Sequence, residues 1–229
     1  MNESAGAGDR LAAVEARITA ACRSAGRSRD EVQLLAVSKT FPLESITALH
    51  ARGQSDFGEN RVQELVDKAM RCPHPEVRWH MIGSLQTNKV AALCRVTQLA
   101  MLHSVDRVKL VDALEFELAR SGRRLDVLIE INASGEVEKH GVEPDGAAAL
   151  AGEVLRREHL ELRGLMTMGP REGDPIPAFR QVDHLRRELE QSLGRALPVL
   201  SMGMSGDLES AIAAGSTLVR IGSALFGER

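Results

Sequence analysis

Short apolar runs and longer amphipathic segments alternate along most of the chain. Eight runs have the length of strands, and most are rich in Val, Leu and Ile; they cover residues 32–38, 55–59, 77–83, 97–105, 125–132, 160–166, 197–203 and 216–222. Helical spacing of apolar residues is found before and between them, at residues 11–25, 43–52, 61–71, 86–93, 106–121, 145–157, 176–193 and 207–214. The runs are apolar throughout rather than at alternate positions, which is typical of strands covered on both faces in a parallel sheet.

Strands that alternate with helices, with no linker between them, predict an α/β fold of the (β/α)8 TIM-type barrel class. A doubly wound open sheet is the alternative, because the number of strands does not show whether the sheet closes. We expect residues 1–229 to form a single domain, in which residues 1–30 supply an extra N-terminal helix and the approach to the first strand. In such a barrel, active-site groups lie at the C-terminal ends of the strands.

Composition then limits the class of protein. The net charge is −3 with both signs interspersed, so the sequence lacks the basic footprint that nucleic acid requires. No apolar run approaches the roughly 18 to 20 residues that span a bilayer, and the N-terminal stretch MNESAGAGDR is not a signal peptide. The three cysteines form no CxxC pair, which fits a reducing compartment. We therefore expect a soluble cytoplasmic protein with no nucleic-acid or membrane partner.

The first apolar run ends on a lysine, Lys39, in the stretch LLAVSKTF. An amine at a barrel mouth, where partial burial and nearby cations favour its neutral form, is suited to forming a Schiff base with a carbonyl compound. A solvated lysine at the end of a strand is the ordinary alternative, and position alone favours it.

Two glycine-containing stretches, SMGMSGD and VRIGS, follow the seventh and eighth runs. Loops at these places form the usual phosphate site of a barrel, because glycines permit close backbone approach and helix N-termini offer free N–H groups. Turn glycines and ordinary helix capping are the alternative. Neither stretch matches a Walker motif or a nucleophile elbow.

Arg220 lies at the end of the eighth run, where its charged, planar group suits a ring nitrogen, a carboxylate or a phosphate. A structural ion pair with Glu59 or Asp207 is the alternative. The histidines predict no metal site, because there is no HExxH motif and His74 and His80 do not share a helical face. We expect His80 to pack or to form hydrogen bonds near the barrel mouth. A Schiff-base lysine, a phosphate site and an arginine together indicate a pyridoxal 5′-phosphate (PLP) site.

Six blocks of sequence resemble the pyridoxal phosphate homeostasis protein family, the single-domain relatives of the alanine racemase barrel. In chain order they are LLAVSKTFP, FGENRVQEL, WHMIGSLQTNK, HSVDR, GLMTMG and LSMGMSGDLESAIAAGSTLVRIGSALFG. The resemblance implies a barrel like the N-terminal domain of alanine racemase, with PLP as the cofactor. It implies that Lys39 carries PLP as a Schiff base and that Arg220 faces the pyridine nitrogen.

The resemblance also assigns the remaining cofactor residues. Ser205 would hold the phosphate together with the backbone of Gly222 and Ser223. Asn60, His80 and Met202 would line the ring pocket. Lys139 matches a lysine that has been proposed in the family as part of a second, transfer-related PLP site.

The function that we expect is binding without significant catalysis: a monomeric carrier or buffer in intracellular PLP homeostasis, with apo forms of PLP-dependent enzymes as partners. A PLP-dependent amino-acid racemase or decarboxylase is the alternative. The related racemases use a tyrosine from a second, C-terminal domain as the opposite base, but this sequence contains no tyrosine and ends with the barrel. A Schiff-base aldolase would keep Lys39 without a bound chromophore, but it leaves the two phosphate-type loops unexplained.

Overall fold

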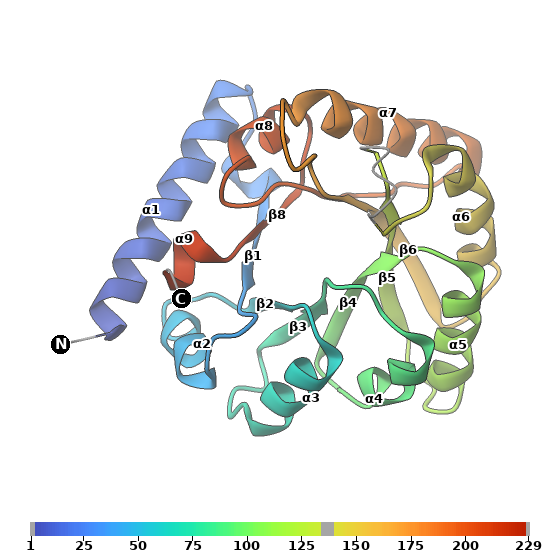
Figure 1. Cartoon of the computed structure of the whole chain (residues 1–229), viewed down its shortest axis with the longest axis horizontal. Helices are drawn as coiled ribbons and strands as arrows, with labels where there is room; N and C mark the ends of the chain where they lie inside the picture. Colours follow the sequence, from blue (N-terminus) through green and yellow to red (C-terminus); the bar gives the residue numbers. More distant parts are fainter. Residues whose placement is uncertain (1–2, 134–139, 228–229) are drawn as a thin grey trace.

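The computed structural model describes residues 3–133 and 140–227. Within them, eight parallel strands pair in sequence order and close into a barrel (Figure 1). The strands are β1 (Gln33–Val37), β2 (Asp56–Glu59), β3 (Arg78–Met81), β4 (Leu99–Val105), β5 (Leu125–Ile131), β6 (Leu160–Thr167), β7 (Val199–Ser201) and β8 (Leu218–Ile221). Closure is shown by the pairing of β1 with β8, which excludes the open sheet and confirms the predicted barrel.

A ring of helices surrounds the strands (Figure 1). They are α1 (Glu3–Ser24), α2 (Leu43–His50), α3 (Val62–Arg71), α4 (Val90–Cys94), α5 (Val108–Ala119), α6 (Ala147–Leu155), α7 (Ile176–Leu193), α8 (Leu208–Ala213) and α9 (Ser223–Phe226). Helix α1 lies outside the barrel, next to α8 and α9. None of the described helices has the length and apolar character needed to cross a bilayer.

Two helices differ most from the sequence-based expectation. Helix α1 begins at Glu3, eight residues before the predicted start, because its first turns pack with a small side chain, Ala7, that gives no strong apolar signal. Helix α9 was not predicted, since four residues are too few to show helical periodicity.

Strand side chains alternate between the helices and the barrel interior, because successive residues of a strand point to opposite faces. The outward residues, Trp79, Leu165 and Val219 among them, belong to one large apolar core shared with the helices. At Gly164 the backbones of β6 and β7 approach so closely that a Cβ would stand 1.7 Å from the carbonyl oxygen of Val199. Gly164 also has a φ of 153°, so this close contact between the two strands requires glycine.

Candidate functional site

A pocket of about 400 Å³ lies at the C-terminal ends of the strands, where barrels of this type place their chemistry. Its lining comes from the ends of β1, β6 and β8 and from the loops after β1, β2, β3, β6, β7 and β8. The lining residues are Val37, Lys39, Asn60, Ile82, Met166, Met168, Met204, Ser205, Gly206, Arg220, Gly222 and Ser223. Six of the eight predicted cofactor residues are therefore brought together here: Lys39, Asn60, Ser205, Arg220, Gly222 and Ser223.

Lys39 is followed by a turn in an unusual conformation. Thr40 has a φ of 70° and is the one non-glycine residue with positive φ in the part of the chain that the structure describes. A β-branched residue rarely adopts this conformation, so the surrounding contacts must hold it. The backbone N–H of Thr40 donates a hydrogen bond to Glu64 Oε1 at 2.5 Å. This contact fixes the backbone directly after the lysine.

The buried ammonium group of Lys68 supports the same turn. Lys68 Nζ donates hydrogen bonds to the carbonyl oxygen of Ser38 at 2.8 Å and to Glu59 Oε1 at 2.6 Å. A third bond goes to Glu64 Oε1 at 2.7 Å, so all three donors of the ammonium group are used. Burial raises the pKa of Glu59, and the hydrogen bond from Lys68 offsets part of that shift. Glu59 thus pairs with Lys68 rather than with Arg220.

The opposite side of the pocket is formed by the loops after β7 and β8. Gly222 is the N-cap of α9, and a Cβ on it would stand 3.3 Å from the carbonyl oxygen of Val37, closer than most Cβ contacts. The first N–H groups of a helix have no partner within the helix. Together with the hydroxyl group of Ser205, they offer hydrogen-bond donors to an anion.

Helix α1 holds both of these loops from outside the barrel. Arg17 Nη2 donates a hydrogen bond to the carbonyl oxygen of Ser205 at 3.0 Å, and its guanidinium group also pairs with Glu209. Arg10 Nε donates to the carbonyl oxygen of Leu225, in α9, at 2.7 Å. The extra N-terminal helix therefore helps to set the positions of the two loops.

Arg220 is buried, and its guanidinium group is anchored by neutral oxygens. Nη1 donates to the carbonyl oxygen and to Oγ of Ser201, both at 2.8 Å, and Nη2 donates to the carbonyl oxygen of Thr167 at 3.0 Å. Burial lowers the pKa of Arg220 to about 10, and the charges of Glu130 and Asp207 oppose that shift. The group therefore stays positively charged at neutral pH.

Comparisons with known proteins identify the family. The model of the alanine racemase N-terminal domain matches residues 10–229. The pyridoxal phosphate homeostasis protein of Aquifex aeolicus is 43% identical over 224 residues, which cover 96% of this chain and 97% of the relative. The human protein of the same name is 41% identical over 248 aligned positions, covering 100% of this chain and 89% of the relative. The chain belongs to the pyridoxal phosphate homeostasis protein family.

Solved structures agree with this family assignment. PipY of Synechococcus elongatus, in a structure with PLP bound, is 31% identical and superposes with a TM-score of 0.83 over 96% of this chain and 100% of that chain. An alanine racemase of Clostridium difficile shares the fold at 13% identity, with a TM-score of 0.72 over 87% of this chain and 56% of that chain. Members of the homeostasis protein family thus share their barrel with the racemases.

Two of the residues that the resemblance assigned to the ring pocket are not among its lining residues. His80 lies inside the barrel, where it contacts Asp56, the first residue of β2, and His103 on β4. It is thus drawn toward the N-terminal ends of the strands rather than toward the mouth. Met202 follows the inward-facing end of β7, so it points outward and is fully buried in the core shared with the helices. Lys139 lies outside the described residues.

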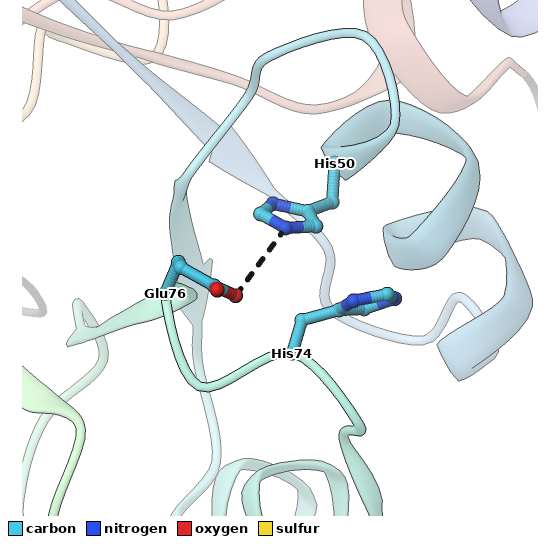
Figure 2. Close-up of side chains that lie close together, drawn as sticks. All are labelled: His50, His74 and Glu76. Carbon is cyan, nitrogen blue, oxygen red and sulfur yellow. Dashed lines mark ion pairs between the residues drawn. The ribbon is translucent and has the colours of Figure 1, made fainter.

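A second group of potential ligands lies at the N-terminal ends of the strands (Figure 2). His50 Nδ1 contacts the carbonyl oxygen of Gln54 at 3.0 Å, and its Nε2 lies 3.9 Å from Glu76 Oε2. The rings of His50 and His74 have centroids 4.6 Å apart, and one ligand atom from each of the three side chains lies within 4.8 Å of the others. Ligands on one tetrahedral zinc ion stand roughly 3.4 Å apart. The spacing here is instead that of an ion pair beside a ring contact.

The sequence did not reveal the groups that support the pocket. Glu64 and Lys68 are four residues apart on α3, a spacing that is common for exposed ion pairs. His103 and Ser201 interrupt apolar strands, and that interruption was the available signal. The pocket also contains three methionines that stand at predicted strand ends but were given no role from the sequence: Met166, Met168 and Met204.

Proposed function

We propose that this protein binds PLP in the pocket at the barrel mouth and that Lys39 holds it as a Schiff base. We infer a role in intracellular PLP homeostasis, in which the protein stores the cofactor and hands it to apo forms of PLP-dependent enzymes without significant catalysis of its own. It would act in the cytoplasm as a monomer, with residues 1–229 as one cofactor-binding domain. The names of its relatives and the PLP-bound structure of PipY support this proposal.

The observation that carries the proposal is the meeting of three kinds of group in one pocket. Lys39 supplies a primary amine, the loops around Ser205 and Gly222 supply donors for an anion, and Arg220 supplies a buried cation. These match the aldehyde, the phosphate and the ring nitrogen of PLP. The volume of about 400 Å³ also suits a molecule of this size.

When bound, PLP supplies an aldehyde that amines convert into imines and a ring that withdraws electrons. Lys39 Nζ would form a C=N bond to the aldehyde carbon, with the aldehyde oxygen leaving as water. Ser205 and the N–H groups at the start of α9 would hold the phosphate and thereby orient the aldehyde toward Lys39. Asn60, on the loop after β2, would contact the cofactor from the opposite side of the mouth.

Arg220 is the main argument against the racemase alternative. A guanidinium group that stays charged at neutral pH would donate a hydrogen bond to the ring nitrogen and disfavour its protonation. An unprotonated ring is a weaker electron sink, so this site would be poorly equipped to stabilise a carbanion. The sequence also contains no tyrosine to act as the opposing base.

The test of the proposed function is the absorption spectrum of the purified protein with added PLP, compared with Lys39→Ala. The parent should show the visible band of a Schiff base, and borohydride should fix PLP to the peptide that contains Lys39. Lys109→Ala, which removes an exposed lysine on α5, is the matched control and should behave like the parent. A band that persists in Lys39→Ala, or no band in the parent, would refute the assignment.

The non-catalytic part of the proposal needs its own measurement. The loaded protein is incubated with single L-amino acids in deuterated water, and exchange at the α-carbon is followed by proton NMR. We expect at most trace exchange. Sustained turnover of any amino acid would refute the carrier role and favour the racemase alternative.

A further inference from the structure

A chain of hydrogen bonds crosses the barrel interior from β2 to the pocket. Asp56 Oδ1 lies 2.9 Å from His80 Nε2, and His80 Nδ1 lies 3.0 Å from His103 Nε2. His103 Nδ1 lies 3.0 Å from Ser201 Oγ, which accepts a hydrogen bond from Arg220 Nη1 at 2.8 Å. All five side chains are buried. The chain thus links five strands, β2, β3, β4, β7 and β8.

If both imidazole rings are neutral, the two ends of this chain fix the direction of every bond within it. Arginine can only donate, so Ser201 Oγ accepts from Arg220, and its own hydrogen is then available to His103 Nδ1. His103 is then protonated on Nε2 and donates to His80 Nδ1. His80 donates from Nε2 to Asp56, whose ionised carboxylate only accepts. Each hydrogen is used once in this arrangement.

Electrostatics agree with this arrangement. Burial is the largest cause that lowers the pKa of His103 well below its ordinary value, and the charge of Arg220 acts in the same direction. Burial alone would raise the pKa of Asp56, but hydrogen bonds from His80 and Arg78 lower it to about 2. The carboxylate at the far end is therefore ionised throughout the physiological range.

We propose that His80, His103 and Ser201 are positioning residues that hold Arg220 in the orientation in which it meets the cofactor. Arginine has five N–H groups, and its bonds to described residues use three of them, two on Nη1 and one on Nη2. The side chain lines the pocket, so a remaining N–H is available to a ligand there. Ser201 fixes one edge of the guanidinium group, His103 orients the hydroxyl group of Ser201, and His80 orients His103.

The inference rests on the proposed function, because it names what prepares that site. Barrel interiors are usually filled by layers of branched apolar side chains. Here a row of polar groups takes that space, and each of them would be costly to bury without its neighbour. The hydrogen bonds of this row run in one direction, and the row ends at Arg220, the one arginine among the described residues that line the pocket.

The first test is the tautomeric state of the histidines in the unmodified protein without PLP. Nitrogen-15 NMR of histidine-labelled protein at neutral pH should show His80 and His103 neutral, with the hydrogen on Nε2. The exposed His184 gives a reference signal in the same spectrum. An imidazolium form, or a hydrogen on Nδ1 of either ring, would overturn the proposed direction of the chain.

The second test measures PLP binding by the visible band. Ser201→Ala removes the hydroxyl group but keeps the carbonyl bond to Arg220, and we expect PLP affinity to fall roughly tenfold, with Ser201→Thr restoring it. Ser216→Ala removes another buried hydroxyl group, one bonded only to carbonyl oxygens, and should bind PLP like the parent. Unchanged affinity in Ser201→Ala would overturn the positioning role and leave the proposed function standing. Failure of the parent to bind PLP would overturn both.

Discussion

Replacing Lys68 by methionine removes a buried cation from beside the turn that carries Lys39. The side chain of Lys68 is 7% exposed and that of its partner Glu59 is 0% exposed. Without Lys68, the Glu59 carboxylate keeps only the hydrogen bond from Ser38 Oγ at 2.6 Å. A carboxylate left buried in this way loses its hydration without gaining a counter-charge in return.

The expected loss of stability follows from that isolation. Breaking a buried ion pair by removing one partner costs about 3–5 kcal/mol. Glu64, the third member, is 22% exposed, so water replaces its lost donor and little is added. The cost should shrink on acidification, because burial has already raised the pKa of Glu59 above its ordinary value of 4.5 and the loss of Lys68 raises it further. When folding raises the pKa of a carboxyl group, the protein becomes more stable as pH falls, because the folded state binds the proton more tightly than the unfolded chain does.

Urea unfolding of the parent, Lys68→Met, Glu59→Gln and the double variant completes the measurement. The double variant should recover most of the loss, since it removes the buried charge together with its partner. Arg71→Met is the control, because Arg71 on the same helix pairs with Asp67 in the open, with side chains 62% and 58% exposed. Its cost should stay within about 0.5 kcal/mol. If Lys68→Met costs no more than Arg71→Met, or if the two single changes simply add, the isolation of Glu59 is not what destabilises the variant.

Three further substitutions test other parts of the site. Burial raises the pKa of Glu130 to about 7, so the folded protein loses stability as pH rises from 4.5 toward 7. The free energy of unfolding of Glu130→Gln should therefore exceed that of the parent by on the order of 3 kcal/mol at pH 8 and equal it at pH 4. Equal values for the two proteins at pH 8 would contradict this. Thr40→Gly should raise the free energy of unfolding by about 1 kcal/mol in urea, since glycine adopts a φ of 70° without strain, whereas a loss would show that the threonine side chain stabilises the turn. Arg17→Ala removes the hydrogen bond to the carbonyl oxygen of Ser205, so PLP should dissociate roughly fivefold faster in a stopped-flow competition assay, with the visible band unchanged. An unchanged dissociation rate would show that this contact from α1 does not affect how the loop around Ser205 holds PLP.

The fold was predictable because its signal is local. Each strand is a short apolar run covered on both faces, and each run is bounded by polar residues that the chain shows in order. Closure was not local, since it depends on the pairing of β1 with β8, which are separated by most of the chain. The barrel was nevertheless favoured, because its strand count and order leave few other topologies.

The pocket residues that follow strand ends could be predicted from the sequence. The buried side chains that hold those residues in place could not. Lys39 and Arg220 lie at the C-terminal ends of strands, where barrels place their active-site groups. The resemblance of six sequence blocks to the family then suggested their roles. In the sequence, Lys68 looks like one half of an exposed i,i+4 helical ion pair with Glu64. It is buried only because α3 packs beside β2, where Lys68 contacts Glu59 and the carbonyl oxygen of Ser38. His80 was assigned to the mouth, because nothing in the sequence tells which way a side chain leans along its strand.

Outward-facing and inward-facing positions of the strands have different roles in this barrel. On β8, Val219 and Ile221 point outward into the apolar core, whereas Arg220 between them points inward to the pocket. On β7, Leu200 packs outward and Ser201 bonds inward to the arginine. A change on an outward position should therefore act on unfolding free energy through lost apolar burial. A change at one of the polar inward positions acts on a row of side chains that depend on one another, so we expect its effect to reach the pocket at the barrel mouth.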